Sequence, residues 1–342
     1  MTMNPATAMT KKQRVDAALT GAAVDRAPIS FWGHSYLKEW SAEELAEAML
    51  ANYHRYDWDY MKVNPRASYH VEDWGATLER TTDPNRGHRF TNWPVREPGD
   101  WRRLRPLAPD RGVLGEQLQA LRQIRDGLAG EAYFIQTIFS PLSVAKYLVG
   151  NQPGPVRMSI ADNPDALKAA LDVITETFAT YAQATLEAGA NGIFFATTGW
   201  ASSDLLTEEQ YRRFGREYDL RVVEAFAEKV PFNVLHNCGE HIYFDLLTDY
   251  PVEAISWAAT LPGNPSLGQG KERTTKAVMG GINEKTTLPD GTPEQVDGEV
   301  RAAVKETEGR RLLLAPGCSI PPRTPEANLE AAAAAVRDLG PR

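Results

Sequence analysis

Cysteine is scarce in this chain, which has two cysteines among 342 residues. Two cysteines cannot build the disulfide framework that holds small secreted domains together. The first six residues, Met1 to Ala6, lack the charged and then apolar order of a secretory signal. The expectation is therefore a cytoplasmic protein whose thiols stay reduced.

Long apolar runs and an excess of positive charge are also missing. No segment approaches the roughly 18 uninterrupted apolar residues that a membrane span requires. The chain carries 45 acidic against 37 basic side chains, for a formal net charge of -8. This balance argues against a large nucleic-acid footprint and against a polybasic membrane anchor. The partners that it predicts are small molecules or other proteins, without nucleic acid and without a membrane.

What the chain does have is the composition of an ordinary folded protein. Hydrophobic residues make up 42% and charged residues 24% of the sequence. Residues 1–10 are small and polar, and they are predicted to form an unstructured tail. Nothing in the remaining sequence marks a domain boundary, so residues 11–342 are expected to form a single domain.

Eight short β-rich apolar runs follow one another along the chain, with helical periodicity between them. Most of the runs are continuous rather than alternating, as is typical of parallel strands covered by helices. Strand and then helix, repeated about eight times, predicts a (β/α)8 TIM barrel. An open doubly wound sheet is the main alternative. The runs are 26–33, 59–65, 133–139, 192–197, 232–238, 254–260, 277–282 and 311–318.

Several helices have recognisable start signals. Thr207 and Thr292 are each followed by a glutamine three residues later, which is the pattern of a capping box. Thr324 is expected to open the last helix in the same way. Two long amphipathic helices are expected over 165–188 and 207–229.

One connection breaks the regular alternation. The stretch 66–132, between the second and third predicted strands, is too long for one helix and contains three tryptophans and several prolines and glycines. We interpret it as an insertion in the barrel that covers a pocket.

The two cysteines fall at the ends of predicted strands, where a barrel of this kind carries its functional residues. The fifth run ends at His236 and Cys238, and alternation along a strand points both side chains to the same face. The eighth run ends at Cys318, at the same end of the barrel. One imidazole and two thiolates form a familiar zinc ligand set, and three protein ligands with a free fourth position are typical of a catalytic site.

The charge of this set indicates its chemistry. Two thiolates cancel the charge of Zn²⁺, so activation of water is less favoured, which argues against a zinc hydrolase. A thiol bound in the fourth position would lose its proton and remain nucleophilic. Three other interpretations are open: two inert buried cysteines, a disulfide, or a purely structural zinc clamp.

Three polar residues near other strand ends are weaker candidates for contact with a ligand. His34 follows the first run and could bind substrate or form a hydrogen bond within its own loop. Gln136 in the third run and Asn283 after the seventh could help to orient a ligand. The favoured interpretation is that they position other side chains that contact the ligand directly.

Several segments together resemble the uroporphyrinogen decarboxylase superfamily, and the resemblance spans nearly the whole chain. His236-x-Cys238 and the later Gly317-Cys318 are similar to the zinc-dependent branch, the methylcobamide:coenzyme M methyltransferases and related corrinoid or thiol methyltransferases. The segments are Phe139–Gly150, His236–Gly239, Gly280–Asn283, Ala315–Cys318 and Thr324–Leu329.

The resemblance implies a (β/α)8 barrel with zinc on His236, Cys238 and Cys318. It implies transfer of a methyl group from a corrinoid or another activated donor to a small-molecule thiol held on zinc. Methylcobamide is then the expected donor, and a separate corrinoid protein is a further expected partner.

The sequence departs from the family in two respects. The decarboxylase has an arginine-rich loop where this chain reads Phe31 to Tyr36 without arginine, so a multiply anionic tetrapyrrole would be poorly held. The methyltransferases carry an acidic residue near the sixth strand, and the run 254–260 has none. Water, Glu240 or the substrate would then take the fourth position on zinc.

The hypothesis from the sequence is a zinc-dependent methyltransferase. One alternative is a metal-free decarboxylase of the same superfamily. The other is a noncatalytic corrinoid-binding module, suggested by how few acid and base groups fall at the strand ends.

Overall fold

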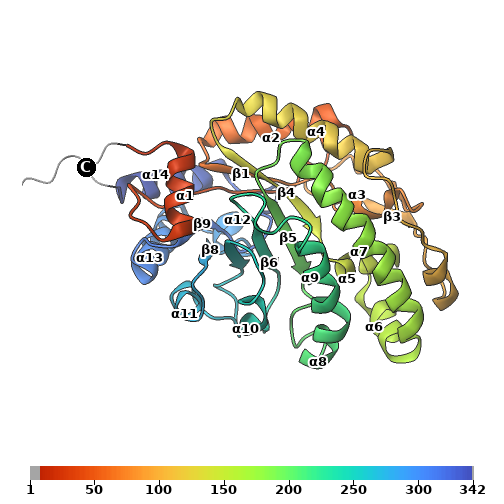
Figure 1. The fold of residues 1–342 in the computed structure, drawn as a ribbon. Coiled ribbons are helices and arrows are strands. Elements are labelled where there is room, and N and C mark those ends of the chain that lie inside the picture. The colour runs from red at the N-terminus through yellow and green to blue at the C-terminus, as the bar shows by residue number, and fades with distance from the viewer. Residues whose placement is uncertain (1–7, 341–342) are drawn as a thin grey trace, which may run out of the picture.

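The computed structural model describes residues 8–340. Its centre is a parallel sheet whose strands are hydrogen-bonded in the order β1-β4-β5-β6-β7-β8-β9, with helices packed outside it (Figure 1). All these strands belong to runs that the sequence predicted, most of them shorter than expected. Their bounds are Tyr60–Val63 (β1), Tyr133–Phe139 (β4), Ile193–Thr198 (β5), Val234–Asn237 (β6), Ala254–Trp257 (β7), Ala277–Ile282 (β8) and Leu312–Pro316 (β9).

The first predicted strand, 26–33, is the exception, because it forms only isolated bridges. Ile29 pairs with Leu314 of β9, and Gly33 pairs with Ile320. On its other side the amide of Asp59 donates to the carbonyl of Ile29 at 2.9 Å. Pro28 has no N–H to add to a ladder, although its carbonyl accepts from Leu314. This segment still closes the sheet between β9 and β1, so the architecture is the predicted (β/α)8 barrel.

The barrel has an inner and an outer apolar layer. Alternate strand residues point inward and fill the interior, whereas the others pack against the helices. Figure 1 shows α2 and α4 along one side of the strands and α7 and α9 along another. The inner layer consists of Val15, Trp32, Tyr60, Ile135, Phe194, Ala196, Phe232, Val234, Ala254, Ala277, Met279, Leu313 and Ala315.

The helices follow the strands along the chain. None of the described helices combines the length and the apolar character needed to cross a membrane. Their bounds are Lys11–Thr20 (α1), Ala42–Tyr56 (α2), Tyr69–Glu72 (α3), Gly112–Leu128 (α4), Pro141–Leu148 (α5), Pro153–Asp162 (α6), Pro164–Glu187 (α7), Glu208–Tyr211 (α8), Glu217–Val223 (α9), Phe244–Leu247 (α10), Leu267–Glu272 (α11), Thr287–Asp290 (α12), Pro293–Thr307 (α13) and Glu326–Asp338 (α14), with a 3₁₀ turn over Pro98–Arg103 and a π-helical turn over Arg212–Arg216.

Two of the three predicted capping signals are confirmed. Thr207 and Thr292 each form a capping box with the glutamine three residues later. Thr324 does not cap α14: its hydroxyl donates to the Pro321 carbonyl at 2.7 Å, and the helix begins at Glu326. The reason is visible in the sequence, because the residue three positions after Thr324 is Ala327, which has no side-chain acceptor.

The predicted helix 207–229 has an unbroken helical backbone from Glu208 to Val223, but it is not α-helical throughout. A π-helical turn over Arg212–Arg216 separates α8 from α9, which ends at Val223. The ring of Tyr211 lies over Gly215, where a Cβ would come within 2.5 Å of it. The wider turn and the missing side chain together make room for this buried ring.

The stretch 66–132 contains more than an insertion. Its last part is α4, the helix that connects β1 with β4, so the extra structure ends before Gly112. The extra structure contains α3, an antiparallel pair formed by β2 (Thr77–Glu79) and β3 (Arg89–Asn92), and the 3₁₀ turn.

The predicted N-terminal tail is ordered at its end. Residues 1–7 of it lie outside the described residues. Thr10 caps α1, and the amide of Met9 donates to Asp25. An unstructured tail that reaches residue 10 is therefore wrong for Met9 and Thr10, because these hydrogen bonds fix them.

Asp219 gives the fold a testable dependence on pH. The hydroxyls of Tyr211 and Tyr250 donate to its Oδ2 atom at 2.9 and 3.0 Å. Burial raises the pKa of this carboxyl from 3.8 to about 7. Because the folded state holds this proton up to a higher pH than the unfolded state, the free energy of unfolding should fall as pH rises from 3.8 to about 7.

Asp219→Asn keeps an acceptor for both tyrosines and removes this titration. We expect the variant to gain stability relative to the native protein by roughly 2 kcal/mol more at about pH 8 than at about pH 4. Urea denaturation at the two pH values measures the difference. An equal effect at both pH values would contradict the assignment.

Candidate metal centre

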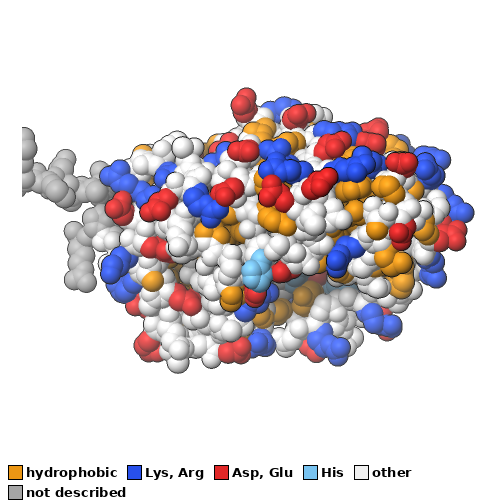
Figure 2. All heavy atoms as spheres, turned by 90° about the horizontal axis from the view of Figure 1, so that it is seen from below, with side chains coloured by type: hydrophobic (Ala, Val, Ile, Leu, Met, Phe, Trp, Pro, Cys, Tyr) orange, Lys and Arg blue, Asp and Glu red, His pale blue; other side chains and the backbone are white. Residues whose placement is uncertain are grey.

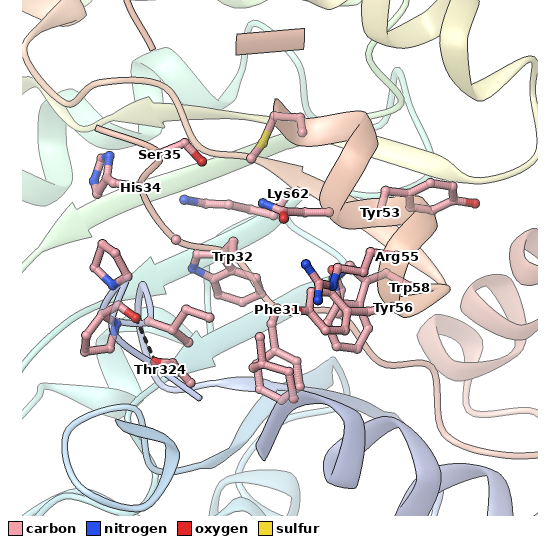
Figure 3. A pocket seen from close by; sticks show the side chains of 18 of the residues that line it. Phe31, Trp32, His34, Ser35, Tyr53, Arg55, Tyr56, Trp58, Lys62 and Thr324 are labelled. Atoms are coloured by element: carbon pink, nitrogen blue, oxygen red, sulfur yellow. Dashed lines mark hydrogen bonds between the residues drawn. The ribbon is translucent and has the colours of Figure 1, made fainter. Parts of the chain in front are cut away.

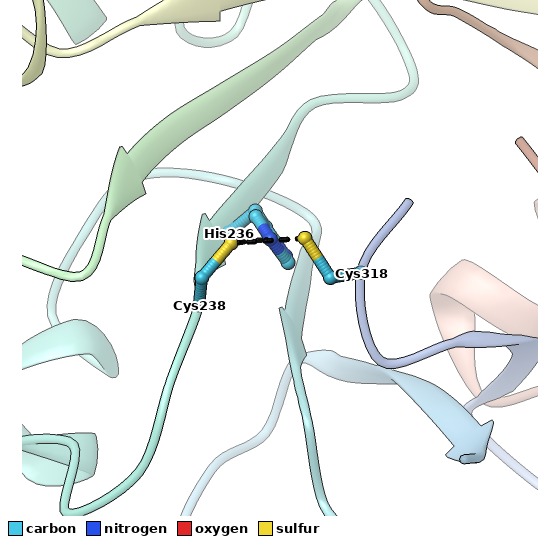
Figure 4. A group of neighbouring side chains, drawn as sticks. All are labelled: His236, Cys238 and Cys318. Atoms are coloured by element: carbon cyan, nitrogen blue, oxygen red, sulfur yellow. Dashed lines mark hydrogen bonds between the residues drawn. The ribbon is translucent and has the colours of Figure 1, made fainter. Parts of the chain in front are cut away.

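Three potential metal ligands meet at the ends of β6 and β9, as the sequence predicted (Figure 4). The ligand atoms of His236, Cys238 and Cys318 all lie within 4.8 Å of one another. Nε2 of His236 is 2.9 Å from Sγ of Cys238, and the two sulfur atoms are 3.0 Å apart. His236 continues the inward row of β6, and Cys318 follows the end of β9 after the close turn at Gly317.

The imidazole of His236 is fixed from behind by β7. Its Nδ1 lies 3.1 Å from Oγ of Ser256, which is the register partner of His236 on β7. This contact turns Nε2 toward the sulfur atoms. A proton on Nδ1 donated to Ser256 would leave the lone pair of Nε2 free for a metal.

The two thiols are free and share a hydrogen bond. Their separation of 3.0 Å is well beyond the about 2.05 Å of a disulfide bond. The hydrogen bond from Cys238 lowers the pKa of Cys318 well below its usual value, and the contact with His236 lowers it further. The same hydrogen bond and burial raise the pKa of Cys238. One thiolate at Cys318 is thus already favoured.

The donor set fits zinc. Two sulfur atoms on one zinc ion can be at most twice the usual Zn–S distance of about 2.3 Å apart, and these lie well within that limit. Glu284, two residues after the end of β8, is a second feature that bears on metal binding. Its side chain is 1% exposed, neither carboxylate oxygen has a hydrogen-bond partner among the described residues, and Nζ of Lys285 lies 3.8 Å from Oε1. Burial raises the pKa of this carboxyl, and a cation bound nearby would stabilise its charged form.

Gly317 makes room for this carboxylate. A Cβ at Gly317 would lie 2.6 Å from Oε2 of Glu284 and 2.8 Å from Cα of Ala258. Glu284 therefore packs directly against the loop that carries Cys318, and its charge acts on Cys318 and His236.

The three ligands line a cavity of about 340 Å³ at the end of the barrel. Figure 2 views the molecule from the side of α8 and α10 and shows a central hollow with hydrophobic side chains in it. Lys62 of β1 and Lys146 of α5 also line this metal pocket, as do Ala67 and His70 of the inserted stretch. Burial lowers the pKa of Lys62 to about 7 and that of Lys146 in the same direction.

The weaker sequence candidates have different positions. His34 lines the metal pocket, and its Nδ1 contacts Glu39 at 3.0 Å, so its contact with substrate stays a prediction. Gln136 does not face the pocket, because strand alternation points it outward to Tyr181 of α7. Asn283 is not there either, since its side-chain oxygen accepts from the amides of Lys285 and Thr286.

Sequence reasoning missed Lys62, Ser256 and Glu284 at this site. Lys62 could have been predicted, because alternation along the run 59–65 points its side chain into the barrel. The register between β6 and β7 that opposes Ser256 and His236 exists only in the assembled sheet. Glu240, the sequence candidate for the fourth position, does not line the metal pocket.

The comparison with protein families decides the relationship. The sequence profile described as Uroporphyrinogen decarboxylase (URO-D) matches residues 10–339. The chain belongs to the uroporphyrinogen decarboxylase family. The resemblance seen in the sequence is thus confirmed over nearly the whole chain.

Within the uroporphyrinogen decarboxylase family, similar proteins include methyltransferases and decarboxylases. Methylcobamide:CoM methyltransferase MtaA of Methanosarcina barkeri is 26% identical over 340 residues, which cover 95% of this chain and 97% of the relative. Uroporphyrinogen decarboxylase of Synechococcus sp. (strain CC9605) is 26% identical over 246 residues, which cover 70% of this chain and 67% of the relative.

A solved structure is also similar to this family member. The structure is described as a methyltransferase from Methanosarcina mazei, with a TM-score of 0.82 and 26% identity. The match covers 96% of this chain and 98% of that one.

We expect the purified family member to bind one equivalent of zinc under reducing conditions. His236→Ala or Cys318→Ser should weaken zinc binding by more than the about 10- to 100-fold that loss of an outer partner costs. Competition with a chromophoric chelator measures the affinity. His54→Ala, an exposed histidine of α2, is the matched control and should bind zinc like the native protein. Equal zinc affinity in all four proteins would refute the site.

Proposed function

We propose that this chain is a zinc-dependent methyltransferase that moves a methyl group from a corrinoid to a thiol held on zinc. The main observation in support is the His236-Cys238-Cys318 cluster, which faces a cavity of about 340 Å³ at the strand ends. The names of the similar methyltransferases support the donor and the type of reaction. A cytoplasmic location and a corrinoid protein as partner belong to the same proposal.

In this proposal four residues of the pocket have a defined task. His236, Cys238 and Cys318 would hold the ion, which when bound supplies a Lewis acid that stabilises a thiolate. Nζ of Lys62 is a base in the same pocket that could take the proton of the acceptor S–H bond. Transfer would form the S–CH3 bond of the product at the expense of the Co–C bond of the methylated corrinoid substrate, and the electron pair of the Co–C bond would stay on cobalt. Proximity and the lowered pKa of the thiol supply the acceleration.

We further propose that Glu284 holds the fourth position on zinc until the thiol arrives. The end of β7 offers no carboxylate, and Glu284 from the neighbouring β8 is buried against the Cys318 loop without a hydrogen-bond partner among the described residues. Glu284 is not within the group of donor atoms that lie inside 4.8 Å, so ligation requires its side chain to move toward the cluster. A thiolate is a stronger zinc ligand than a carboxylate and can displace it.

The pocket argues against decarboxylation of a tetrapyrrole. No arginine is among the residues that line it, and two lysines are its cationic side chains outside the histidines. A substrate with several carboxylates depends on bidentate partners that this pocket does not provide. The decarboxylase alternative therefore receives no support from the site.

The first test is methyl transfer from methylcobalamin to a thiol under anaerobic conditions. We expect the zinc-loaded protein to convert methylcobalamin to cob(I)alamin and to produce the methyl thioether, detected by absorbance and mass spectrometry. Cys318→Ser should lower the rate by about a hundredfold or more, because the thiol then lacks its activating ion. His54→Ala should react like the native protein. Retained transfer after removal of zinc would contradict the mechanism.

The second test concerns Glu284. Glu284→Gln should weaken zinc binding, because a neutral amide is a poorer zinc ligand than a carboxylate. It should also change the electronic spectrum of the cobalt(II)-loaded protein without thiol, and leave the spectrum with bound thiol close to that of the native protein. Glu330→Gln, at an exposed position of α14, is the control. An unchanged thiol-free spectrum in Glu284→Gln would show that Glu284 does not ligate.

A further inference from the structure

A second cavity lies beside the metal pocket, between the irregular first strand and the helix layer (Figure 3). Its volume is about 430 Å³, within the range of small-molecule sites. Segment 30–38, α2, the end of β1 and residues 320–329 contribute its walls. We refer to this cavity as the side pocket.

The side pocket has aromatic walls. Tyr56 and Trp58 stack with ring centroids 5.1 Å apart, and Phe31 meets Trp58 edge-on at 5.1 Å. Met49 and Met61 add apolar, adaptable surface. Leu37, 47% exposed and one of few large apolar side chains that face solvent in residues 8–340, lies at the rim. Such walls favour a flat apolar group.

The side pocket and the metal pocket share a wall. Trp32, His34 and Lys62 line both cavities. Figure 3 shows Trp32 and Lys62 between His34 on one side and the group of Tyr53, Tyr56 and Trp58 on the other.

The backbone explains why a wall of side chains separates the two cavities. On the β1 side, the backbone of segment 26–33 forms hydrogen bonds only between Ile29 and Asp59 within the described residues. Its isolated bridges, to Leu314 and Ile320, lie on the side of β9. Beyond Ile29 no ladder to β1 is formed within the described residues, so side chains rather than backbone separate the cavities.

Lys62 is the part of this wall that can move most easily. Its ammonium group is buried, 4.8 Å from the ring centroid of Phe194 and 5.6 Å from that of Trp32. It hydrogen-bonds to Asn64 and forms no ion pair with a carboxylate of the described chain. A flexible four-carbon stem that forms no ion pair can change rotamer and open a path between the two cavities.

We propose that the side pocket holds the apolar, ring-bearing part of the thiol acceptor, whose sulfur reaches the metal pocket past Lys62. This inference rests on the proposed function and extends it to the substrate class. The corrinoid has to approach the sulfur from the open end of the barrel, which leaves the lateral side pocket for the remainder of the acceptor. A thiol without such a tail would leave the aromatic walls exposed to water.

The test uses ω-phenylalkanethiols with one to five methylene groups and 2-mercaptoethanol as the short reference. Dissociation constants are measured from the sulfur-to-cobalt absorption of the cobalt(II)-loaded protein. We expect one chain length to bind about tenfold or more tightly than 2-mercaptoethanol, because burial of the ring adds that much affinity. Equal affinity for all the thiols would overturn the inference and leave the proposed function in place.

A matched pair of variants locates the tail. Met49→Trp fills the side pocket and should abolish the preference for the phenyl thiols, whereas Met158→Trp, at a position 65% exposed on α6, should retain it. Asn52→Trp, from an exposed position on the wall, keeps the test available if Met49→Trp does not fold. A preference that persists in both side-pocket variants would overturn the inference.

A sulfur-free probe separates the two proposals. 4-Phenylbutan-1-ol should bind the zinc-loaded protein and change the fluorescence of Trp32 and Trp58, and Met49→Trp should abolish this binding. If this holds while no thiol alters the cobalt spectrum, the side pocket is a ligand site and the proposed function is wrong. If 4-phenylbutan-1-ol does not bind, the side pocket assignment is overturned.

Discussion

The site depends on closure of the barrel between β9 and β1, where the irregular segment 26–33 takes the place of a regular strand. The fully buried carboxylate of Asp59 accepts from the guanidinium groups of Arg14 and Arg26 and from the amide of Ile29. These bonds hold the irregular first strand to β1 where a regular ladder is missing. Removal of either arginine would leave the buried charge of Asp59 uncompensated, so the ion pairs stabilise the contact between segment 26–33 and β1. β9 is then held between the first strand and β8, and the loop after it reaches β6.

The charges around the cluster favour a bound cation. Cys318 is the favoured thiolate, Cys238 shares its proton, and the buried carboxylate of Glu284 has no donor within residues 8–340. Lys62 brings a positive charge into the same pocket, although burial weakens its hold on the proton. A divalent ion would compensate the sulfur atoms and the carboxylate together. The same charges explain why such a site favours a bound thiolate over activated water.

In the proposed function, the two cavities would select the thiol acceptor in two separate ways. The metal pocket would select for sulfur through the softness of its ligands, and the side pocket would select for shape and apolar surface. They meet at side chains rather than at backbone because the first strand is irregular. In the proposed function, residues of the first strand and α2 would select the acceptor separately from the ligation by His236, Cys238 and Cys318.

The repeating strands and helices, the shared face of His236 and Cys238, and the family were all predictable from the amino-acid sequence. These depend on periodicity and on motifs that are local in the chain. The sequence overextended the first strand and did not show that Gln136 and Asn283 lie away from the metal pocket, because side-chain direction and the partners of an irregular segment are set by neighbours far away in sequence. Glu284 and the wall shared through Lys62 emerged only in the tertiary structure. Burial and the absence of donors are properties of packed surroundings, and residues 80 positions apart become one site only when the barrel closes.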